Sequence, residues 1–336
     1  MNDRMTLAAE FVNGTDWRGA KLTPLAGDAS NRRYMRLANG QGSAVLMDAP
    51  AECGEDVRPF VAIARHLAAM GLSAPRILAQ DTARGFLLLE DLGDDLYARV
   101  IPRSPEIEPE IYEAATDVLV HLHTQPLPSG LKAYHPALMA DMAALAFEWY
   151  AGDAGSLRRG AAHAAILAAL ADHASADSAL IQRDYHAENL LWLPERHDNA
   201  RVGLLDFQDA MRGHPAYDLV SLLQDARRDV PPQIEAAMIR RYIERAAVPA
   251  DTFDAAYHVL GAQRNLRILG VFARLCLRDG KAHYIDLIPR VWDHLLRDLA
   301  HPALAGAALL ILGALPAPTP EFLKDLKARC ARPQTP

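Results

Sequence analysis

The chain has 336 residues, of which 51% are hydrophobic, 23% charged and 7% aromatic. This length predicts two domains or lobes, and the composition excludes a disordered chain because enough apolar surface is present to build a core. Lysine and arginine number 35 against 42 aspartates and glutamates, so the net charge is −7, and no basic run exceeds two residues. We therefore expect no nucleic acid as a partner, since nucleic-acid binders carry a basic surface.

The remaining composition indicates a reducing compartment. The three cysteines, Cys53, Cys276 and Cys330, are far apart in the sequence, which argues against a disulfide framework and a cysteine-rich zinc site. The first residues lack an apolar run of signal-peptide length, and the most apolar segment, 303–315, is too short to span a bilayer. We expect that segment to be a buried helix and the protein to be cytoplasmic, with no membrane partner. The oligomeric state stays open.

The N-terminal part of the chain has the pattern of a small sheet. Short β-like runs at 34–37 and 44–47 flank an Asn-Gly turn, which is a hairpin signal. Residues 59–70 carry apolar side chains at helical spacing, and further β-like runs follow at 76–79 and 85–90. This part therefore reads as strands, one helix and strands again.

From Asp94 onward the pattern is mainly helical, with apolar residues three and four positions apart. One non-helical island interrupts it, in which β-like runs at 190–193 and 202–205 follow a loop rich in Asp, His and Asn. The stretches expected as helices are 109–124, 138–150, 161–173, 232–246 and 251–277.

The island carries three residues with a shared chemistry. Asp184 is followed five residues later by Asn189, and Asp206 ends the next β-like run. Phosphoryl transfer needs one carboxylate near the attacking hydroxyl, and hard oxygen ligands that hold Mg²⁺ against nucleotide phosphates. An Asp-x4-Asn loop followed by a strand that ends in Asp supplies both, so this spacing indicates a phosphotransferase.

The same motif resembles the signature of the aminoglycoside phosphotransferase and choline kinase-like family. That signature reads H-G-D-x-H-x-x-N, followed by a strand and I-D-F or I-D-W. This chain has Q-R-D-Y-H-A-E-N over 182–189 and L-D-F over 205–207. The resemblance covers nearly the whole chain and implies ATP and Mg²⁺ as cofactors. It further implies that Asp184 is the catalytic base and that Asn189 and Asp206 hold the metal.

By the same resemblance the fold is α+β, the two-lobed fold of a protein kinase. Residues 1–92 would form a small nucleotide-binding lobe, a β-sheet with one helix. Residues 93–336 would form a large, mainly helical lobe with the catalytic loop and the substrate site. In the family, backbone groups at the junction of the lobes contact adenine, and a glycine-containing loop contacts the phosphates. The residues expected to bind the nucleotide are Ser30, Asn31, Arg32, Arg33, Glu90 and Leu92.

A narrower resemblance connects the chain to the bacterial cell-wall sugar kinases. Segments 27–34, 47–50, 86–93, 222–230 and 263–269 look like that subgroup. Its members phosphorylate the anomeric hydroxyl of N-acetylmuramate and N-acetylglucosamine during peptidoglycan recycling, so we expect an amino sugar as substrate. The residues expected to face it are Asp225, Arg228, Arg264 and Asn265.

Two departures from the family pattern weaken the expectation of turnover. The His-Gly that precedes the catalytic Asp is replaced by Gln182 and Arg183, and the strand that usually carries a phosphate-binding Lys has Met47 instead. A methionine cannot pair with phosphates. Arginine on the neighbouring loop and strand, at position 32, 33 or 36, could supply the charge.

Two further residues are expected to support the site rather than react. His186 follows the base by two positions, and we interpret it as a brace for the loop. Asp218, in the run P-A-Y-D-L, resembles the family's Asp that caps and fixes the catalytic loop.

Three other functions stay open at this point. One is a kinase of the same fold that acts on aminoglycosides or another small alcohol. Another is a nucleotide-binding pseudokinase without turnover, suggested by the missing Lys. The third is a metal-dependent phosphoesterase that uses Asp184, His186 and Asp206, although the chain lacks the further His-rich strands which that class needs.

Overall fold

The computed structural model describes residues 2–25, 31–40, 42–152 and 157–331, which form two compact units. Unit 1 comprises Met1–Val118 and Ala187–Ala210, and unit 2 comprises Leu119–His186 and Met211–Pro336. The chain therefore passes from unit 1 to unit 2 and back before it ends in unit 2. The expected division into a nucleotide-binding lobe, residues 1–92, and a helical lobe with the substrate site, residues 93–336, stays a prediction.

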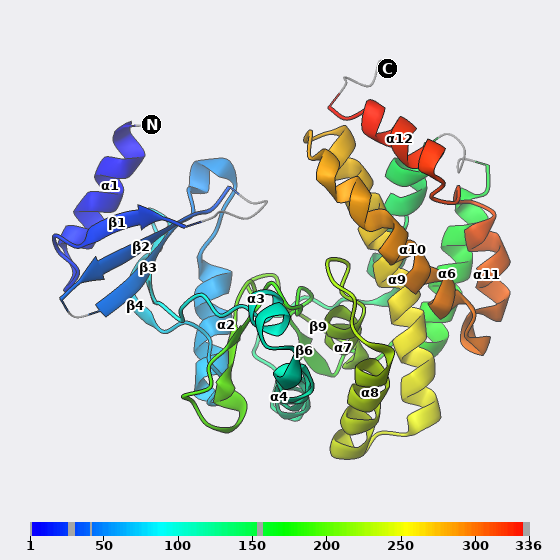
Figure 1. Ribbon diagram of the computed structural model, residues 1–336, viewed down its shortest axis with the longest axis horizontal. Helices are drawn as coiled ribbons and strands as arrows, with labels where there is room; N and C mark the ends of the chain where they lie inside the picture. The colour runs from blue at the N-terminus through cyan, green and yellow to red at the C-terminus, as the bar shows by residue number, and fades with distance from the viewer. Residues whose placement is uncertain (1, 26–30, 41, 153–156, 332–336) are drawn as a thin grey trace. The chain divides into compact units, whose positions relative to one another are not determined.

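Unit 1 is built on a five-stranded antiparallel sheet with the strand order β1-β2-β3-β5-β4. Figure 1 labels β1 to β4 of this sheet. Asn39 pairs with Gly42 across the turn between β2 and β3, which confirms the predicted hairpin. The strands are β1 (Lys21–Pro24), β2 (Arg33–Asn39), β3 (Gly42–Asp48), β4 (Ile77–Asp81) and β5 (Phe86–Glu90).

One face of this sheet is covered by α1 (Asn2–Asn13), a helix that the sequence analysis did not predict. Phe11 of α1 stacks on Phe86 of β5, with ring centroids 5.6 Å apart. Met35 and Leu37 of β2 join this core. Side chains alternate along a strand, so the residues that lie between these core positions belong to the opposite face of the sheet. That face does not contribute to this core.

A helix of unit 1 packs against the residue that follows Asp206. Phe60 of α2 (Arg58–Ala69) stacks on Phe207 with ring centroids 4.8 Å apart. That contact fixes the residue directly after Asp206. Unit 1 also holds α3 (Tyr97–Arg103), the first part of α4 (Glu108–His123), and the antiparallel pair β7 (Leu190–Trp192) and β8 (Val202–Leu204).

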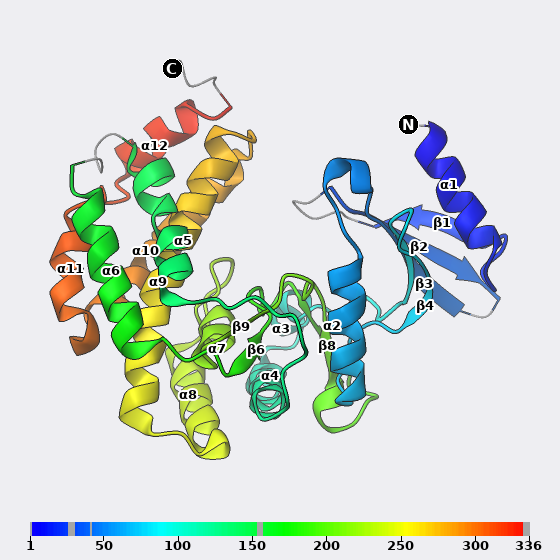
Figure 2. The ribbon, with the colours of Figure 1, turned by 180° about the vertical axis from the view of Figure 1, so that it is seen from behind.

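Unit 2 is organised around α9 (Ala250–Leu277), which contacts α5, α6, α7 and α10 (Figure 2). A Cβ atom at Gly270 would stand 2.2 Å from the Leu145 carbonyl carbon, so only glycine permits this approach to the chain before the π-helical segment Ala146–Tyr150. The other elements are α5 (Pro136–Ala143), α6 (Arg159–His173), β6 (Ala179–Ile181), β9 (Met211–Gly213), α7 (Ala216–Leu223), α8 (Pro232–Ala246), α10 (Ile288–Leu299), α11 (Ala305–Leu312) and α12 (Pro320–Ala328).

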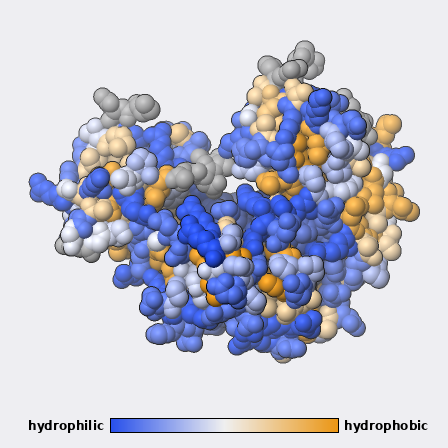
Figure 3. Space-filling view, viewed as in Figure 1, coloured by the Kyte–Doolittle hydropathy of each residue, from blue (hydrophilic) through white to orange (hydrophobic). Residues whose placement is uncertain are grey.

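The apolar segment 303–315 forms α11, but the expectation of a buried helix is only partly right. Ile311 is buried, whereas Leu309 is 84% and Leu310 43% exposed, and apolar surface is visible over this helix in Figure 3. Within the described residues, no single helix is long and apolar enough to cross a membrane. Only Ala282–Leu299 and Pro302–Leu312, taken together across a 94° bend, pass that test by length and composition.

Near the start of the loop between β6 and β7, hydrogen bonds hold a residue in the left-handed conformation. Asp218 of α7 accepts the backbone N–H of Gln182 at 2.6 Å and that of Arg183 at 2.9 Å, which confirms its predicted role in fixing the loop. Arg183 has φ 73°, and its carbonyl oxygen accepts a 3.3 Å hydrogen bond from the Ser221 hydroxyl. Its guanidinium lies 5.3 Å from the centroid of the Tyr134 ring. Arg183 thus adopts a backbone conformation that favours the glycine of the family signature.

We predict that Arg183→Gly is more stable than Arg183→Ala by about 1 kcal/mol, because both remove the contact with Tyr134 but only glycine removes the Cβ strain at positive φ. Urea unfolding of the two variants measures the difference. Equal stabilities would contradict the strain at this residue.

Candidate active site

Asp184 lies in unit 2, one residue after the left-handed Arg183, and is partly exposed. Burial raises the pKa of Asp184, but the positive charges of Arg267 and Arg264, among others, outweigh burial and hold its pKa below the usual value. Asp184 is therefore an ionised carboxylate at neutral pH, able to accept a hydrogen bond from a substrate hydroxyl.

His186 is buried, and burial lowers its pKa to about 4 although the charges of Asp225 and Asp184 oppose the shift. The imidazole is therefore neutral at pH 7, and it is a poor source of positive charge for phosphates. This is consistent with the expected bracing role, which remains a prediction.

The two expected metal ligands both lie in unit 1. The Leu205 N–H donates to the Asn189 carbonyl oxygen at 3.0 Å, so the residue before Asp206 is tied to Asn189 across the β7–β8 pair. Asp206 itself has φ 55° and accepts a 2.7 Å hydrogen bond from Gln208 Nε2 on Oδ1.

This donor set fits Mg²⁺. A carboxylate and an amide are the oxygen ligands that the ion prefers, and Mg²⁺ bound with substrate phosphates needs only one or two protein ligands. The Asp206 carboxylate already attracts a cation, since Arg32 Nη2 lies 3.3 Å from its Oδ1. No group of three or more His, Cys, Asp or Glu side chains suited to a metal occurs in the part of the chain that the structure describes.

Among the arginines considered as replacements for the missing Lys, Arg32 is the one with a contact to an expected metal ligand. Besides Asp206, Arg32 pairs with Glu55, whose Oε2 lies 3.6 Å from Nε. Arg36 pairs with the carboxylates of Asp91 and Asp94 instead. Arg33 is exposed, and Met47 is buried in β3. Of these three arginines, Arg32 is thus the one that the structure holds beside Asp206.

The other residues expected to bind nucleotide have the following places. The Asn31 N–H donates to Glu55 Oε1 at 3.1 Å. The Glu90 carboxylate pairs with Arg196 and Arg76, and its N–H donates to the Arg76 carbonyl oxygen at 2.8 Å. Leu92 follows β5, and Ser30 lies outside the described residues.

The residues expected to face the substrate all lie in unit 2, but they do not form a single cluster. Asp225 and Arg264 are buried, at 2% and 4% exposure. Asn265 Nδ2 instead donates to Gln224 Oε1 at 2.8 Å and to Asp298 Oδ2 at 3.1 Å, in a different buried cluster. Arg228 is half-buried in the segment that follows α7.

Sequence reasoning missed Glu55. Glu55 precedes α2 in a polar stretch without any local pattern, and only its pairing with Arg32 reveals it. Arg267 follows Arg264 by three residues on α9, and helical spacing puts such residues on neighbouring positions of one face.

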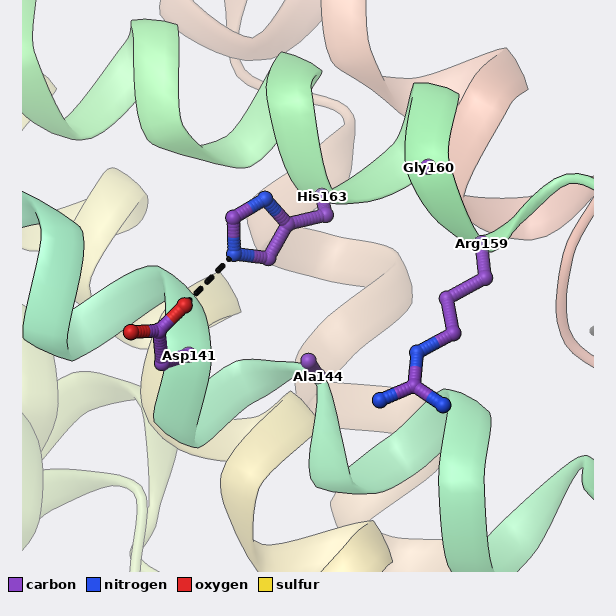
Figure 4. A pocket seen from close by; sticks show the side chains of 5 residues that line it. All are labelled: Asp141, Ala144, Arg159, Gly160 and His163. Atoms are coloured by element: carbon purple, nitrogen blue, oxygen red, sulfur yellow. Dashed lines mark hydrogen bonds and ion pairs between the residues drawn. The ribbon is translucent and has the colours of Figure 1, made fainter.

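A separate pocket of about 530 Å³ lies between α5 and α6 in unit 2 (Figure 4). In it His163 Nε2 stands 2.9 Å from Asp141 Oδ1, and the Arg159 side chain comes from the start of α6. None of the residues predicted for the site lines this pocket.

Several known proteins are similar to this chain over most of its length. It is 43% identical to the N-acetylmuramate/N-acetylglucosamine kinase of Caulobacter vibrioides, over 90% of this chain and 94% of that protein. It is 37% identical to the enzyme of the same name from Pseudomonas aeruginosa, over 88% and 89% of the two chains.

Solved structures support the same fold. The microcompartment-associated aminopropanol kinase matches with a TM-score of 0.64 at 15% identity, over 91% of this chain and 99% of that one. The choline kinase LicA from Streptococcus pneumoniae matches with a TM-score of 0.62 at 14% identity, over 87% and 99%. These confirm the predicted kinase-like fold, with its N-terminal sheet and mainly helical C-terminal part. The family model described as "Phosphotransferase enzyme family" matches residues 21–256, and the chain belongs to that family.

Proposed function

We propose that the protein is an ATP- and Mg²⁺-dependent kinase that phosphorylates the anomeric hydroxyl of N-acetylmuramate or N-acetylglucosamine, a cytoplasmic step of peptidoglycan recycling. The observation that carries this proposal is the 43% identity to a kinase named for these two sugars, over 90% of the chain. The ionised Asp184 on an anchored loop agrees with it, because transfer to a hydroxyl needs a carboxylate in that position.

In this reaction Asp184 orients the sugar hydroxyl by accepting its hydrogen bond. The hydroxyl oxygen forms the new bond to the γ-phosphorus of ATP while the bond between that phosphorus and the oxygen bridging to the β-phosphate breaks, and the hydroxyl proton passes to Asp184. Arg32 offsets the negative charge of the phosphates. Asn189 and Asp206 would hold Mg²⁺, which when bound neutralises charge on the β- and γ-phosphates.

A direct competition tests the proposal. N-acetylmuramate, N-acetylglucosamine, kanamycin and choline are offered at equal concentration with Mg²⁺ and ATP, and the products are assigned by NMR. We expect phosphate at the anomeric position of the amino sugars. A preference for kanamycin or choline, or phosphate at another position, would contradict it. ATP binding without turnover would identify a pseudokinase, and hydrolysis of a phosphoester without transfer would identify a phosphoesterase.

We predict that Asp184→Asn lowers kcat by about 10²–10⁴-fold, because the amide cannot accept the hydroxyl proton. The KM for ATP should change little, since the carboxylate contacts the acceptor. Steady-state kinetics measures both values, and Glu188→Gln, an exposed carboxylate on the same loop, is the matched control. A loss of kcat below about threefold would remove Asp184 from the mechanism.

We predict that Asp206→Ala abolishes most of the thermal stabilisation given by Mg²⁺ and ATP together, because the carboxylate is the one charged ligand of the proposed metal pair. Asn189→Ala should act in the same direction but more weakly, since it removes a neutral ligand. Thermal unfolding with ATP, with and without Mg²⁺, measures the effect. Unchanged stabilisation in Asp206→Ala would mean that the metal assignment is wrong.

We predict that Arg32→Gln raises the KM for ATP more than Arg33→Gln does. The two residues are neighbours of equal charge, but only Arg32 contacts Asp206 and Glu55 in the structure. One charge-assisted hydrogen bond to phosphate corresponds to a rise of about tenfold or more. ATP saturation curves for both variants and for Met47→Ala decide the point, and equal values for Arg32→Gln and the wild type would refute it.

A further inference from the structure

Unit 2 contains two buried charged residues, Arg264 and Asp225, whose hydrogen-bonding capacity is only partly used. The Arg264 Nη2 donates to the Ser221 hydroxyl at 2.7 Å, while its Nε and Nη1 have no hydrogen-bond partner among the described residues. Asp225 Oδ1 accepts the Arg227 N–H at 2.8 Å, whereas Oδ2 has no partner within the same part of the chain. Both side chains are more than nine-tenths buried.

Such a pair is costly in the absence of a ligand. Burying a polar group without a hydrogen-bond partner destabilises the folded protein, and the penalty is larger when the group is charged. Buried donors and acceptors in folded proteins are almost always satisfied, so open ones need an explanation. A bound molecule that uses both a donor and an acceptor here would recover this cost.

The open pair is connected to the catalytic loop. Ser221 receives the hydrogen bond from Arg264 and donates its own to the Arg183 carbonyl oxygen, directly before Asp184. Arg264 and Asp184 also influence each other's charge, and Asp225 acts in the same way on His186. A ligand on Arg264 and Asp225 is therefore at the acceptor side of the reaction.

The atoms without a hydrogen-bond partner indicate which chemical groups a ligand needs at this position. Guanidinium N–H groups donate to oxygen, and a carboxylate oxygen accepts from O–H or N–H, which is the pattern of sugar hydroxyl and acetamido groups. A polycation fits poorly because Arg183, Arg264 and Arg267 all act on Asp184 with positive charge. The two candidate sugars share the ring hydroxyls and the acetamido group, and only N-acetylmuramate has a lactyl carboxylate.

We propose that Arg264 and Asp225 bind the acceptor sugar through the hydroxyl and acetamido groups that N-acetylmuramate and N-acetylglucosamine have in common. This inference rests on the proposed function and names the residues that give it its substrate. Arg228 and Asn265 are not part of this pair.

The test compares Arg264→Gln and Asp225→Asn with Arg240→Gln, an exposed arginine on α8. We expect each of the first two to raise the KM for both sugars by about tenfold or more and by similar factors, as for a lost hydrogen bond to a charged group. The KM for ATP should stay within about twofold of wild type, and Arg240→Gln should match wild type throughout. Calorimetric titration with each sugar in the absence of ATP gives the same comparison without turnover.

An unchanged sugar KM in Arg264→Gln and Asp225→Asn would overturn the proposal. A loss confined to N-acetylmuramate would also overturn it, because Arg264 would then bind the lactyl carboxylate. If Arg264→Gln does not fold, Arg264→Lys and Asp225→Asn carry the same comparison. A wild-type enzyme that binds and phosphorylates neither sugar would instead refute the proposed function, which is a distinct outcome.

Discussion

The catalytic loop depends on one buried carboxylate, that of Asp218. Its two oxygens accept the backbone N–H groups of Gln182 and Arg183, and these bonds hold the left-handed turn that precedes Asp184. Burial raises the pKa of Asp218 to about 7, while the two N–H donors oppose that rise. The carboxylate and the loop therefore stabilise each other: without the loop the charge would be buried unpaired, and without the carboxylate nothing would offset the strain at Arg183.

Phosphate binding requires a positive charge close to the phosphates, and it does not matter which strand or loop carries that charge. Met47 cannot pair with an anion, yet Arg32 lies between Glu55 and Asp206 and is held there by both carboxylates. An arginine keeps its charge in such a place, and its planar donors suit phosphate oxygens as well as a lysine ammonium does. The missing Lys therefore does not by itself argue for a pseudokinase.

Local patterns predicted most elements but not the pairings between distant residues. Apolar spacing located α8 and α9 closely, and the motif singled out Asp184, Asn189 and Asp206, because these signals are contained in short stretches of chain. Arg264 and Asn265 show the limit. They are neighbours in sequence, yet a helix turns about 100° per residue, so one bonds Ser221 and the other bonds Asp298. Which cluster each of them joins depends on helices folded against α9, and no local pattern carries that information.

The charges around Asp184 also affect its strength as a base toward the substrate hydroxyl. Arginines hold its pKa below the usual value, so it is a weak base that cannot remove a proton from an ordinary alcohol before transfer begins. In a loose transition state the hydroxyl oxygen becomes acidic only as its bond to phosphorus forms, so a weak, well-placed base is sufficient late in the reaction. An anomeric hydroxyl is more acidic than other sugar hydroxyls because the ring oxygen withdraws electrons from its carbon. A weakly basic Asp184 is therefore compatible with the anomeric acceptor proposed above, whose hydroxyl needs the least activation of those on the sugar.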